Sequence, residues 1–482
     1  SDLSADNLYV YPNANATTPE NFSNIRRLYG VYTDIQFDYD NYFFINLTAR
    51  NDWSSTLPEQ NNSFFYPGVS TSFIFTDALG ISNSVLSYGK LRASWANVGS
   101  DENPYQLAFN YTPVPDLFTQ FVADNTYPHG GQLAFAATNT IPPGNSLLPQ
   151  NQNTFEIGTE LQLFDGRATI DFTYYNTVTS DQIISVQIPQ STGFEAVRTN
   201  VGEVSNKGIE ALLSVTPIQT TNFNWDITFN FTRNRQAVEN LAPGLDELAL
   251  TSGFSGLSVR AEPGQDFGLY GAGWLRNDDG ELIINETTGE RQVGDRQRFG
   301  SIFPDYLLGI QNNFNYKGVN LSFLIDMRQG GVLWSNTTQT LRSSGRAAET
   351  LANRGQIFID EGVIQNEDDT FRPNDVPVRS MQDWWGTYAG ASIIESNIFD
   401  ATYVKLREVV LSYSLPQSLI ENTFFQKVAI GIEGRNLLLI HSEVPHIDPE
   451  TNFFGTSLIG EGVEFNSVPS SRSVGFNIQL GF

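Results

Sequence analysis

The sequence predicts an all-β protein, a transmembrane antiparallel β-barrel with long loops at one end. Three observations support this fold class. Segments of about ten residues or more alternate between apolar and polar side chains, short and long connections follow one another in strict alternation, and no run of residues is apolar enough for a membrane helix.

The alternation is clearest in the segment 319–327. Every second residue there is apolar: Val319, Leu321, Phe323, Ile325 and Met327. The positions between them include Asn320, Ser322 and Asp326. The segments 224–231 and 474–482 repeat the pattern, which indicates strands with one apolar and one polar face. Strands of this length exceed the five or six residues usual in soluble sheets and suffice to cross a bilayer.

The connections between the predicted strands fall into two classes. The shorter ones are 39–41, 77–87, 165–167, 218–223, 315–318 and 415–425. The long ones lie near 53–63, 100–151, 180–206, 237–303, 330–397 and 438–470. This is the layout of an outer-membrane barrel with short periplasmic turns and long extracellular loops.

About thirteen strands are predicted. They are 28–38, 42–52, 64–76, 88–99, 152–163, 168–179, 207–217, 224–236, 304–315, 319–329, 398–414, 426–437 and 471–482. Because bacterial single-chain barrels have even strand numbers, an odd count predicts that residues 28–482 form part of a barrel. Residues 1–27 are polar, and we expect them to be the remnant of an extracellular loop, where proteolytic nicking is common.

Composition excludes several function classes. The 482 residues include 53 acidic and 27 basic side chains, a formal net charge of −26, which argues against binding nucleic acid. The absence of cysteine rules out disulfides and thiolate metal sites. No GxSxG, HExxH or Walker-type run occurs, so we expect no catalytic residues, no enzyme activity and no cofactor.

Several motifs occur in a fixed order along the chain. They include Arg50–Ser55 within YFFINLTARNDWSS, LRASWANVG at 91–99, NVGEVSNKGIE at 200–210, YVKLR at 403–407 and GRNLL at 434–438. Together they resemble the SusC/RagA family of TonB-dependent outer-membrane transporters. The resemblance covers residues 28–482 and implies the C-terminal part of a 22-strand barrel.

The resemblance also implies a function and partners. Family members import nutrient oligomers, either oligosaccharides or oligopeptides, commonly under a SusD-like surface lipoprotein, with energy from the TonB complex acting on a plug domain. The plug and the first strands are not recognisable here, so we expect them in an N-terminal portion of the transporter outside this chain. Phe482, a terminal aromatic, is expected to be the assembly signal. A passive porin, a surface adhesin and a barrel enzyme remain as alternatives.

Loop aromatics are the candidate substrate contacts. They are Trp384, Trp385, Trp334, Trp274 and Tyr388, with Tyr270 nearby in the sequence. Sugars and apolar peptide side chains bind such rings, but packing within the loop is the alternative, and both interpretations stay open for Trp384 and Trp385. Trp95 and Trp225 lie inside predicted strands, where an aromatic belt or a lipid-facing position is favoured.

Acidic clusters are the candidate metal sites, and none is favoured. Loop 237–303 has eleven carboxylates and five arginines, which are typical of a solvated surface. The sequence Asn277–Gly280 lacks the spaced ligands of a Ca²⁺ loop. The segment His446–Glu450 resembles a structural loop of the family, and we expect a structural role there.

Overall fold

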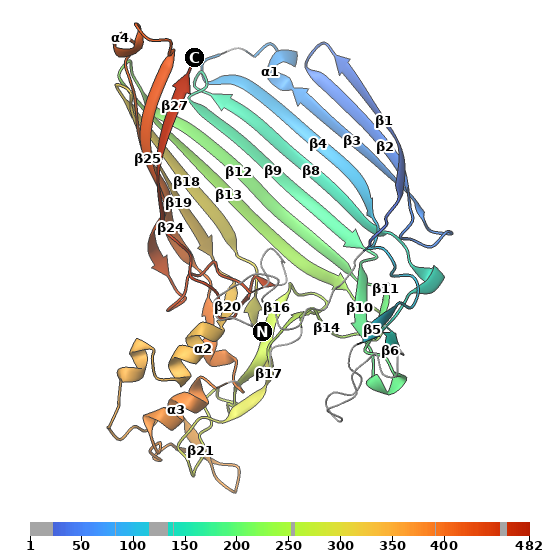
Figure 1. Cartoon of the computed structure of the whole chain (residues 1–482), viewed down its shortest axis with the longest axis vertical. Coiled ribbons are helices and arrows are strands. Elements are labelled where there is room, and N and C mark those ends of the chain that lie inside the picture. Colours follow the sequence, from blue (N-terminus) through green and yellow to red (C-terminus); the bar gives the residue numbers. More distant parts are fainter. Residues whose placement is uncertain are drawn as a thin grey trace, which may run out of the picture.

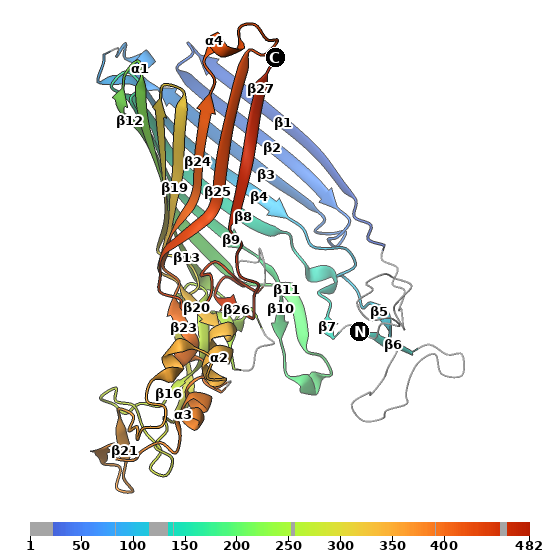
Figure 2. The same cartoon turned by 60° about the vertical axis from the view of Figure 1, so that its left-hand side comes forward.

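The computed structural model describes residues 23–81, 83–114, 134–137, 139–251, 256–390, 392–453 and 460–482. Its main element is one sheet of thirteen strands, in which neighbouring strands are antiparallel and follow one another along the chain. The sheet curls into a partial barrel whose two edges are the first and the last strand (Figures 1 and 2). The predicted fold class is confirmed.

The thirteen strands are β1 (Leu28–Tyr39), β2 (Phe43–Ser54), β3 (Ser63–Ile74), β4 (Leu86–Ser100), β8 (Gln150–Leu163), β9 (Ala168–Ser180), β12 (Glu203–Gln219), β13 (Phe223–Asn240), β18 (Tyr306–Tyr316), β19 (Val319–Gln329), β24 (Tyr403–Ser414), β25 (Lys427–Ser442) and β27 (Ser473–Gly481). Each corresponds to one predicted strand. The strand predicted at 398–414 is divided, because Ile398–Asp400 forms β23 and pairs in another sheet, while β24 begins at Tyr403.

The shortest connections are tight turns at one end of the barrel. Asp40 and Asn41 between β1 and β2 have φ values of 54° and 58°, and Lys317 and Gly318 between β18 and β19 have 47° and 87°. Two successive residues with positive φ match the right-handed twist of the flanking strands, so each turn fixes the register of its hairpin. The C-terminus and the short helices α1 (Phe75–Ala78) and α4 (Gln417–Ile420) lie at this same end (Figure 1).

The register separates the two faces of the sheet. Leu213, Phe229, Ile310 and Ile325 are partners on four successive strands, and they form one apolar row. Many large apolar side chains of this face are exposed, among them Leu47, Trp95, Ile157, Leu213, Ile430 and Phe476. Such a face is suited to lipid, whereas the opposite face carries the polar and charged residues of the strands.

Trp225 provides a hydrogen-bond donor for an asparagine side chain on the apolar face. The register places Asn312 beside Ile227 and Phe323, among apolar neighbours. The indole Nε1 of Trp225 donates a hydrogen bond to Asn312 Oδ1 at 3.2 Å. This bond removes much of the cost of an amide on a lipid-facing surface, which fits the lipid-face position predicted for Trp225.

The long connections contain small elements of their own. These are β5 (Tyr111–Val114), β6 (Ala134–Ala137), β7 (Thr140–Ile141), η2 (Gly144–Ser146), β10 (Ile183–Gln187), η3 (Gln190–Thr192), β11 (Ala196–Asn200), β14 (Leu248–Ala249), β15 (Ser258–Ala261), β16 (Gly268–Trp274), β17 (Val293–Ser301), β20 (Val332–Ser335), α2 (Asn336–Ser343), η4 (Ala348–Leu351), β21 (Val363–Gln365), β22 (Phe371–Pro373), α3 (Met381–Tyr388), η5 (Glu395–Asn397) and β26 (Val463–Glu464).

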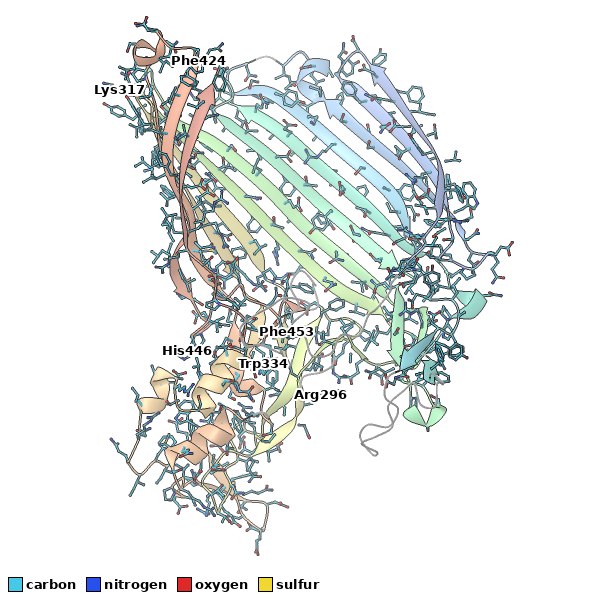
Figure 3. All side chains as sticks on the ribbon, in the orientation of Figure 1. Arg296, Lys317, Trp334, Phe424, His446 and Phe453 are labelled. Carbon is cyan, nitrogen blue, oxygen red and sulfur yellow. The ribbon has the colours of Figure 1, made fainter. Side chains whose placement is uncertain are left out.

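Two of these connections fold together into what we call the loop lobe, the described residues within 241–305 and 330–402. It lies at the end of the barrel opposite the short turns, where Figure 3 shows Trp334 in it and Phe424 and Lys317 at the far end. Its core is a buried cluster of Leu257, Val259, Leu269, Ile302, Trp334 and Ile394, and Val463 from the connection between β25 and β27 packs into the same cluster. The helices of the described chain are all too short or too polar to cross a membrane.

Candidate functional site

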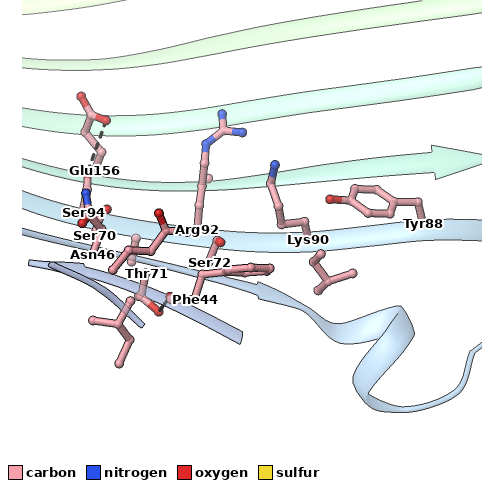
Figure 4. Close-up of a pocket in the computed structure, with 15 residues that line it drawn as sticks. Phe44, Asn46, Ser70, Thr71, Ser72, Tyr88, Lys90, Arg92, Ser94 and Glu156 are labelled. Atoms are coloured by element: carbon pink, nitrogen blue, oxygen red, sulfur yellow. Dashed lines mark hydrogen bonds between the residues drawn. The ribbon is translucent and has the colours of Figure 1, made fainter. Parts of the chain in front are cut away.

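The concave face of the sheet forms a polar groove. A hollow of about 650 Å³ lies over β2, β3, β4 and β8. Its labelled lining residues in Figure 4 are Phe44, Asn46, Ser70, Thr71, Ser72, Tyr88, Lys90, Arg92, Ser94 and Glu156. Half of these ten have small amide or hydroxyl side chains and three are charged, as expected for a surface that faces water or a polar partner inside a barrel.

The cations of this groove are paired. Lys90 Nζ lies 2.7 Å from Glu160 Oε2, and the guanidinium of Arg92 lies 2.5 Å from Asp171 Oδ1. Arg92 also donates to Thr173 Oγ1 at 2.5 Å. These pairs link β4 to β8 and to β9 across the groove and leave it with little unbalanced positive charge.

Two glycines allow side chains to cross an intervening strand. Arg92 on β4 reaches Asp171 on β9 by passing over Gly158 of β8, where an added Cβ would lie 2.6 Å from Arg92 Nε. In the same way Tyr175 passes over Gly208 and donates to Asn234 Oδ1 at 3.1 Å. A side chain at either glycine would displace these polar contacts, so both glycines are required by a close approach.

The aromatic candidates gather in the loop lobe, and most of them are buried. Tyr388 stacks on Trp384 with ring centroids 4.6 Å apart and on Trp274 with centroids 5.8 Å apart. The guanidinium carbon of Arg291 lies 5.2 Å from the Tyr388 ring centroid and 5.8 Å from each of the two indoles. Trp274 on β16 and Trp384 on α3 belong to different long loops, so the stack joins those loops.

A buried carboxylate completes the stack. Asp360 accepts from Arg291 Nε at 2.7 Å and Nη2 at 3.0 Å, and also from Trp384 Nε1 at 2.8 Å. The Asp360 side chain is 4% exposed, so these donors replace its water shell. Glu395 makes a second such link, because it accepts from Arg276 and from the backbone N–H of Trp274.

The remaining aromatic candidates differ in exposure. Trp334 and Tyr270 are buried, 4% exposed each. Burial and the nearby negative charge of Glu262 raise the pKa of Tyr270, so it stays a neutral phenol. Trp385 and Tyr388 are half-buried. Of the five candidates for substrate contact, Trp274, Trp334 and Trp384 therefore pack inside the lobe, and Trp385 and Tyr388 retain exposed surface. Contact of any of them with substrate stays a prediction.

The segment His446–Glu450 is held against the barrel wall. Lys405 Nζ lies 2.5 Å from both Asp448 Oδ1 and Glu450 Oε2, and its side chain is 4% exposed. Arg407 donates to Glu450 Oε1 at 2.6 Å. Figure 3 places His446 beside the loop lobe, where its Nε2 lies 3.0 Å from Glu349 Oε2. This geometry supports the predicted structural role.

Low pH should detach the segment His446–Glu450 from the barrel wall. Burial alone would raise the pKa of Glu450, but hydrogen bonds from Arg407 and Lys405 outweigh it and lower the pKa to about 2. A carboxyl whose pKa is lowered on folding stabilises the folded state above its unfolded pKa of about 4.3, and this stabilisation is lost as the pH falls toward 2. We expect hydrogen exchange in residues 443–453 to be slow at pH 7 and to accelerate, after correction for intrinsic rates, below about pH 4.

Two variants test the assignment of this transition. Glu450→Gln should already exchange fast at pH 7, because a neutral amide cannot pair with two cations. Glu443→Gln should match the wild type, because the ion pair of the Glu443 carboxylate among the described residues is with the exposed His441. Equal exchange in the two variants would contradict the role of Glu450.

The terminal aromatic lies at the short-turn end. The Phe482 ring stacks on Phe424 with centroids 5.8 Å apart and contacts Phe425 at 5.4 Å. Phe482 is 71% exposed, which leaves it accessible to another molecule. Its role as an assembly signal stays a prediction.

The acidic segment Asn277–Gly280 and the polar N-terminal segment were the remaining candidates from the sequence. Asn277 Oδ1 accepts from the backbone N–H groups of Asp279 and Glu281, so Asn277–Gly280 is a hydrogen-bonded turn. Within the described ranges, no group of three or more His, Cys, Asp or Glu side chains is arranged to hold a metal ion. Residues 1–22 lie outside the described residues, and Arg26 pairs with Asp101 in the connection that follows β4.

Sequence reasoning missed the residues that organise the lobe. Asp360 is one of nine carboxylates in loop 330–397, and its partner Arg291 is 69 positions away. No spacing or local motif marks such a pair. Arg354, which lines a second hollow beside Trp385, was missed for the same reason.

Comparison with known proteins identifies the class. The family model "TonB dependent receptor-like, beta-barrel" matches residues 2–281, more than half of the 482 residues. The chain belongs to this family of outer-membrane β-barrel proteins.

Individual relatives have the same family name. TonB-dependent receptor P3 of Formosa agariphila is 24% identical over 495 residues, covering 96% of this chain and 46% of that protein. TonB-dependent receptor SusC of Bacteroides thetaiotaomicron is 24% identical over 307 residues, covering 59% of this chain and 29% of SusC. The chain thus spans under half the length of these relatives.

A solved structure shows the same fold. The RagAB peptide transporter superimposes with a TM-score of 0.76 at 20% identity, covering 99% of this chain and 50% of the matched chain. The resemblance to the SusC/RagA class seen in the sequence motifs is confirmed.

Proposed function

We propose that this chain forms the C-terminal part of the barrel of an outer-membrane importer, which uses energy from the TonB complex to take up nutrient oligomers, either glycan or peptide. Membership of the TonB dependent receptor-like family is the observation on which the proposal rests most. The polar concave face supports it, because cargo or a plug inside the barrel would meet such a surface. Short turns would then face the periplasm, and the loop lobe would face the outside.

A SusD-like lipoprotein is the proposed partner at the outer end. SusC and the RagAB transporter, which this chain resembles, are the relatives that suggest such a partner. The loop lobe would provide the docking surface, and Trp385 and Tyr388 would be available to partner or cargo.

We also propose that further strands, a plug and the TonB contact are supplied by a part of the transporter outside this chain. The free edges of β1 and β27 support this. Each edge would leave unpaired N–H and C=O groups in hydrocarbon, at a cost of several kcal/mol per group, so other strands must pair with them.

Disulfide cross-linking tests whether β1 and β27 are neighbours in the assembled barrel, and the chain has no native cysteine that would interfere. We expect Ile35→Cys combined with Val474→Cys, Phe476→Cys or Ile478→Cys to form no disulfide in the assembled barrel, because inserted strands separate β1 from β27. The positive control is Ile35→Cys with Leu47→Cys, which are direct register partners. A β1–β27 disulfide formed as efficiently as the control would show that the thirteen strands close by themselves.

Uptake measurements separate the importer from the alternatives. In cells that lack the protein, uptake of a labelled oligosaccharide or oligopeptide mixture should fall, and a protonophore should abolish uptake in wild-type cells. Uptake that persists with the protonophore would indicate a passive porin. Surface binding without uptake would indicate an adhesin, and degradation of the label by the purified protein would indicate a barrel enzyme.

A further inference from the structure

A hollow on the surface of the loop lobe has an unusual charge. It measures about 580 Å³ and lies between α2, η4 and α3. Figures 1 and 2 show α2 and α3 side by side at the outer end. Its lining consists of Ser343, Ser344, Gly345, Thr350, Arg354, Gly355, Ser380, Met381, Gln382 and Trp385. No carboxylate is among these described lining residues, although the chain has 53 acidic residues and a net charge of −26.

Arg354 gives the hollow its positive charge. Its Nε donates to the Thr350 carbonyl at 2.8 Å, and its Nη2 donates to the Gly345 carbonyl at 2.6 Å and to Thr350 Oγ1 at 3.0 Å. These bonds fix the guanidinium plane. Nη1 makes no hydrogen bond or ion pair with the described residues, so two N–H groups remain available to a ligand.

Most other cations of the region are neutralised. Arg291, Arg342 and Arg276 each pair with a carboxylate in the lobe, and Lys90 and Arg92 do so in the barrel groove. Arg354 instead is held by backbone carbonyls, which orient it without cancelling its charge. A guanidinium that is fixed in this way and has no ion-pair partner among the described residues is suited to a carboxylate or a sulfate, which would accept charge-assisted hydrogen bonds from Nη1.

Trp385 supplies an apolar surface to the same hollow. It is half-buried, and its ring is held edge-to-face against Trp384 at 4.9 Å and Tyr388 at 5.3 Å between centroids. Its buried Nε1 has no hydrogen-bond partner among the described residues. A rigid aromatic beside an arginine and several hydroxyls matches a pyranose ring that bears an acidic group.

Neither Asp383 nor Glu290 is among the residues that line this hollow. Asp383 and Glu290 line an adjoining hollow together with Arg379. Ser380 Oγ donates to Asp383 Oδ2 at 2.8 Å, and Thr387 Oγ1 donates to Glu290 Oε2 at 3.1 Å. Among the described lining residues of the Trp385 hollow, Arg354 therefore supplies the charge.

We propose that this hollow is a subsite for an anionic saccharide unit, a uronate or a sulfated sugar, in which Arg354 binds the acidic group and Trp385 contacts the ring. The proposal rests on the import function proposed above and names its cargo class, an acidic oligosaccharide. We favour glycan over peptide as the cargo because Arg354 and Trp385 lie side by side, as an acidic group and the ring that bears it would require.

Calorimetric titration of the detergent-purified transporter tests the subsite separately from transport. The probes are tetragalacturonate, a sulfated galactan tetrasaccharide, neutral cellotetraose and tetraglutamate. We expect at least one of the acidic saccharides to bind at least tenfold more tightly than cellotetraose and tetraglutamate, with affinity that falls as salt increases. Whichever of the two binds more tightly identifies the acidic group as carboxylate or sulfate.

Matched variants locate the binding. Arg354→Gln and Trp385→Ala should each weaken binding of the acidic saccharide about tenfold or more, and Arg354→Lys should retain part of it. Arg372→Gln removes the same charge from the same loop at an exposed pair with Asp375, and it should leave the affinity unchanged. Retained heat-modifiable mobility in electrophoresis would show that the variants are folded.

The outcomes decide the proposal. No binding of either acidic saccharide, equal binding of cellotetraose, tighter binding of tetraglutamate, or an Arg354→Gln variant that binds like the wild type would each overturn the subsite. Loss of uptake in cells with intact binding would instead count against the proposed import function and leave the subsite standing.

Discussion

Replacing Asp360 with alanine should loosen the loop lobe while leaving the barrel assembled. The variant leaves Arg291 without its carboxylate inside an aromatic stack and removes the acceptor of Trp384 Nε1. Removing one partner of a buried ion pair costs about 3–5 kcal/mol, and we expect the lower end because Arg291 is 20% exposed. Hydrogen exchange in α3 and β16 should accelerate, since the stack joins those two elements.

The matched control for this variant is Asp375→Ala. Asp375 also pairs with an arginine, Arg372, but its side chain is 76% exposed, so water replaces the lost contact. We expect no change in exchange. Heat-modifiable mobility should be the same for both variants, because the barrel is held by strand-to-strand hydrogen bonds. Similar exchange in α3 for the two variants would mean that the Asp360 pair does not hold the lobe together.

The barrel strands could be predicted from the sequence because each strand encodes its own pattern. In a membrane barrel the two faces of every strand meet lipid and water, so polarity alternates residue by residue, as it does from Val319 to Met327. The turns are equally local, since Asp40–Asn41 and Lys317–Gly318 are short polar or glycine-containing pairs. Such signals need no knowledge of distant contacts.

The loop lobe could not be predicted in the same way. Its core joins β15, β16, β20 and β26, whose members are up to about two hundred residues apart, and its strands are too short to show alternation. The sequence marked Trp274, Trp384 and Tyr388 as chemically notable, but nothing local distinguishes rings that pack on each other from rings that meet a ligand. Only the position of Arg291 and Asp360 explains why two of the indoles are buried.

The residues of the candidate subsite could not be predicted from the sequence either. Trp385 follows Trp384 directly, and the sequence gives the two residues equal weight. In the helix α3 their side chains point in different directions, so that Trp384 joins the stack and Trp385 lines the hollow with Arg354. The distinction arises from helix geometry and from an arginine in another segment of the loop.

An arginine on the lipid face should damage the barrel far more than one on the concave face. Phe229 lies mid-strand in an apolar row between Leu213 and Ile310, with no polar neighbour in that row to receive a guanidinium. A charge there must be buried in hydrocarbon or must bend the strand toward the interface, at a cost of about 2–4 kcal/mol near the midplane. We therefore expect Phe229→Arg to lower the amount of heat-modifiable barrel in outer membranes and to lower the urea midpoint of unfolding in lipid vesicles.

The adjacent residue provides the control on the same strand. Asn230 is exposed on the concave face beside Gly309, which leaves space for a longer side chain. Asn230→Arg should assemble at wild-type levels and unfold at a midpoint close to the wild type, because its guanidinium stays in water. The two variants add the same charge one residue apart, so their difference measures the side of the sheet that meets lipid. Equal loss in both would contradict a lipid-facing position for Phe229 and, with it, the transmembrane orientation of the whole sheet.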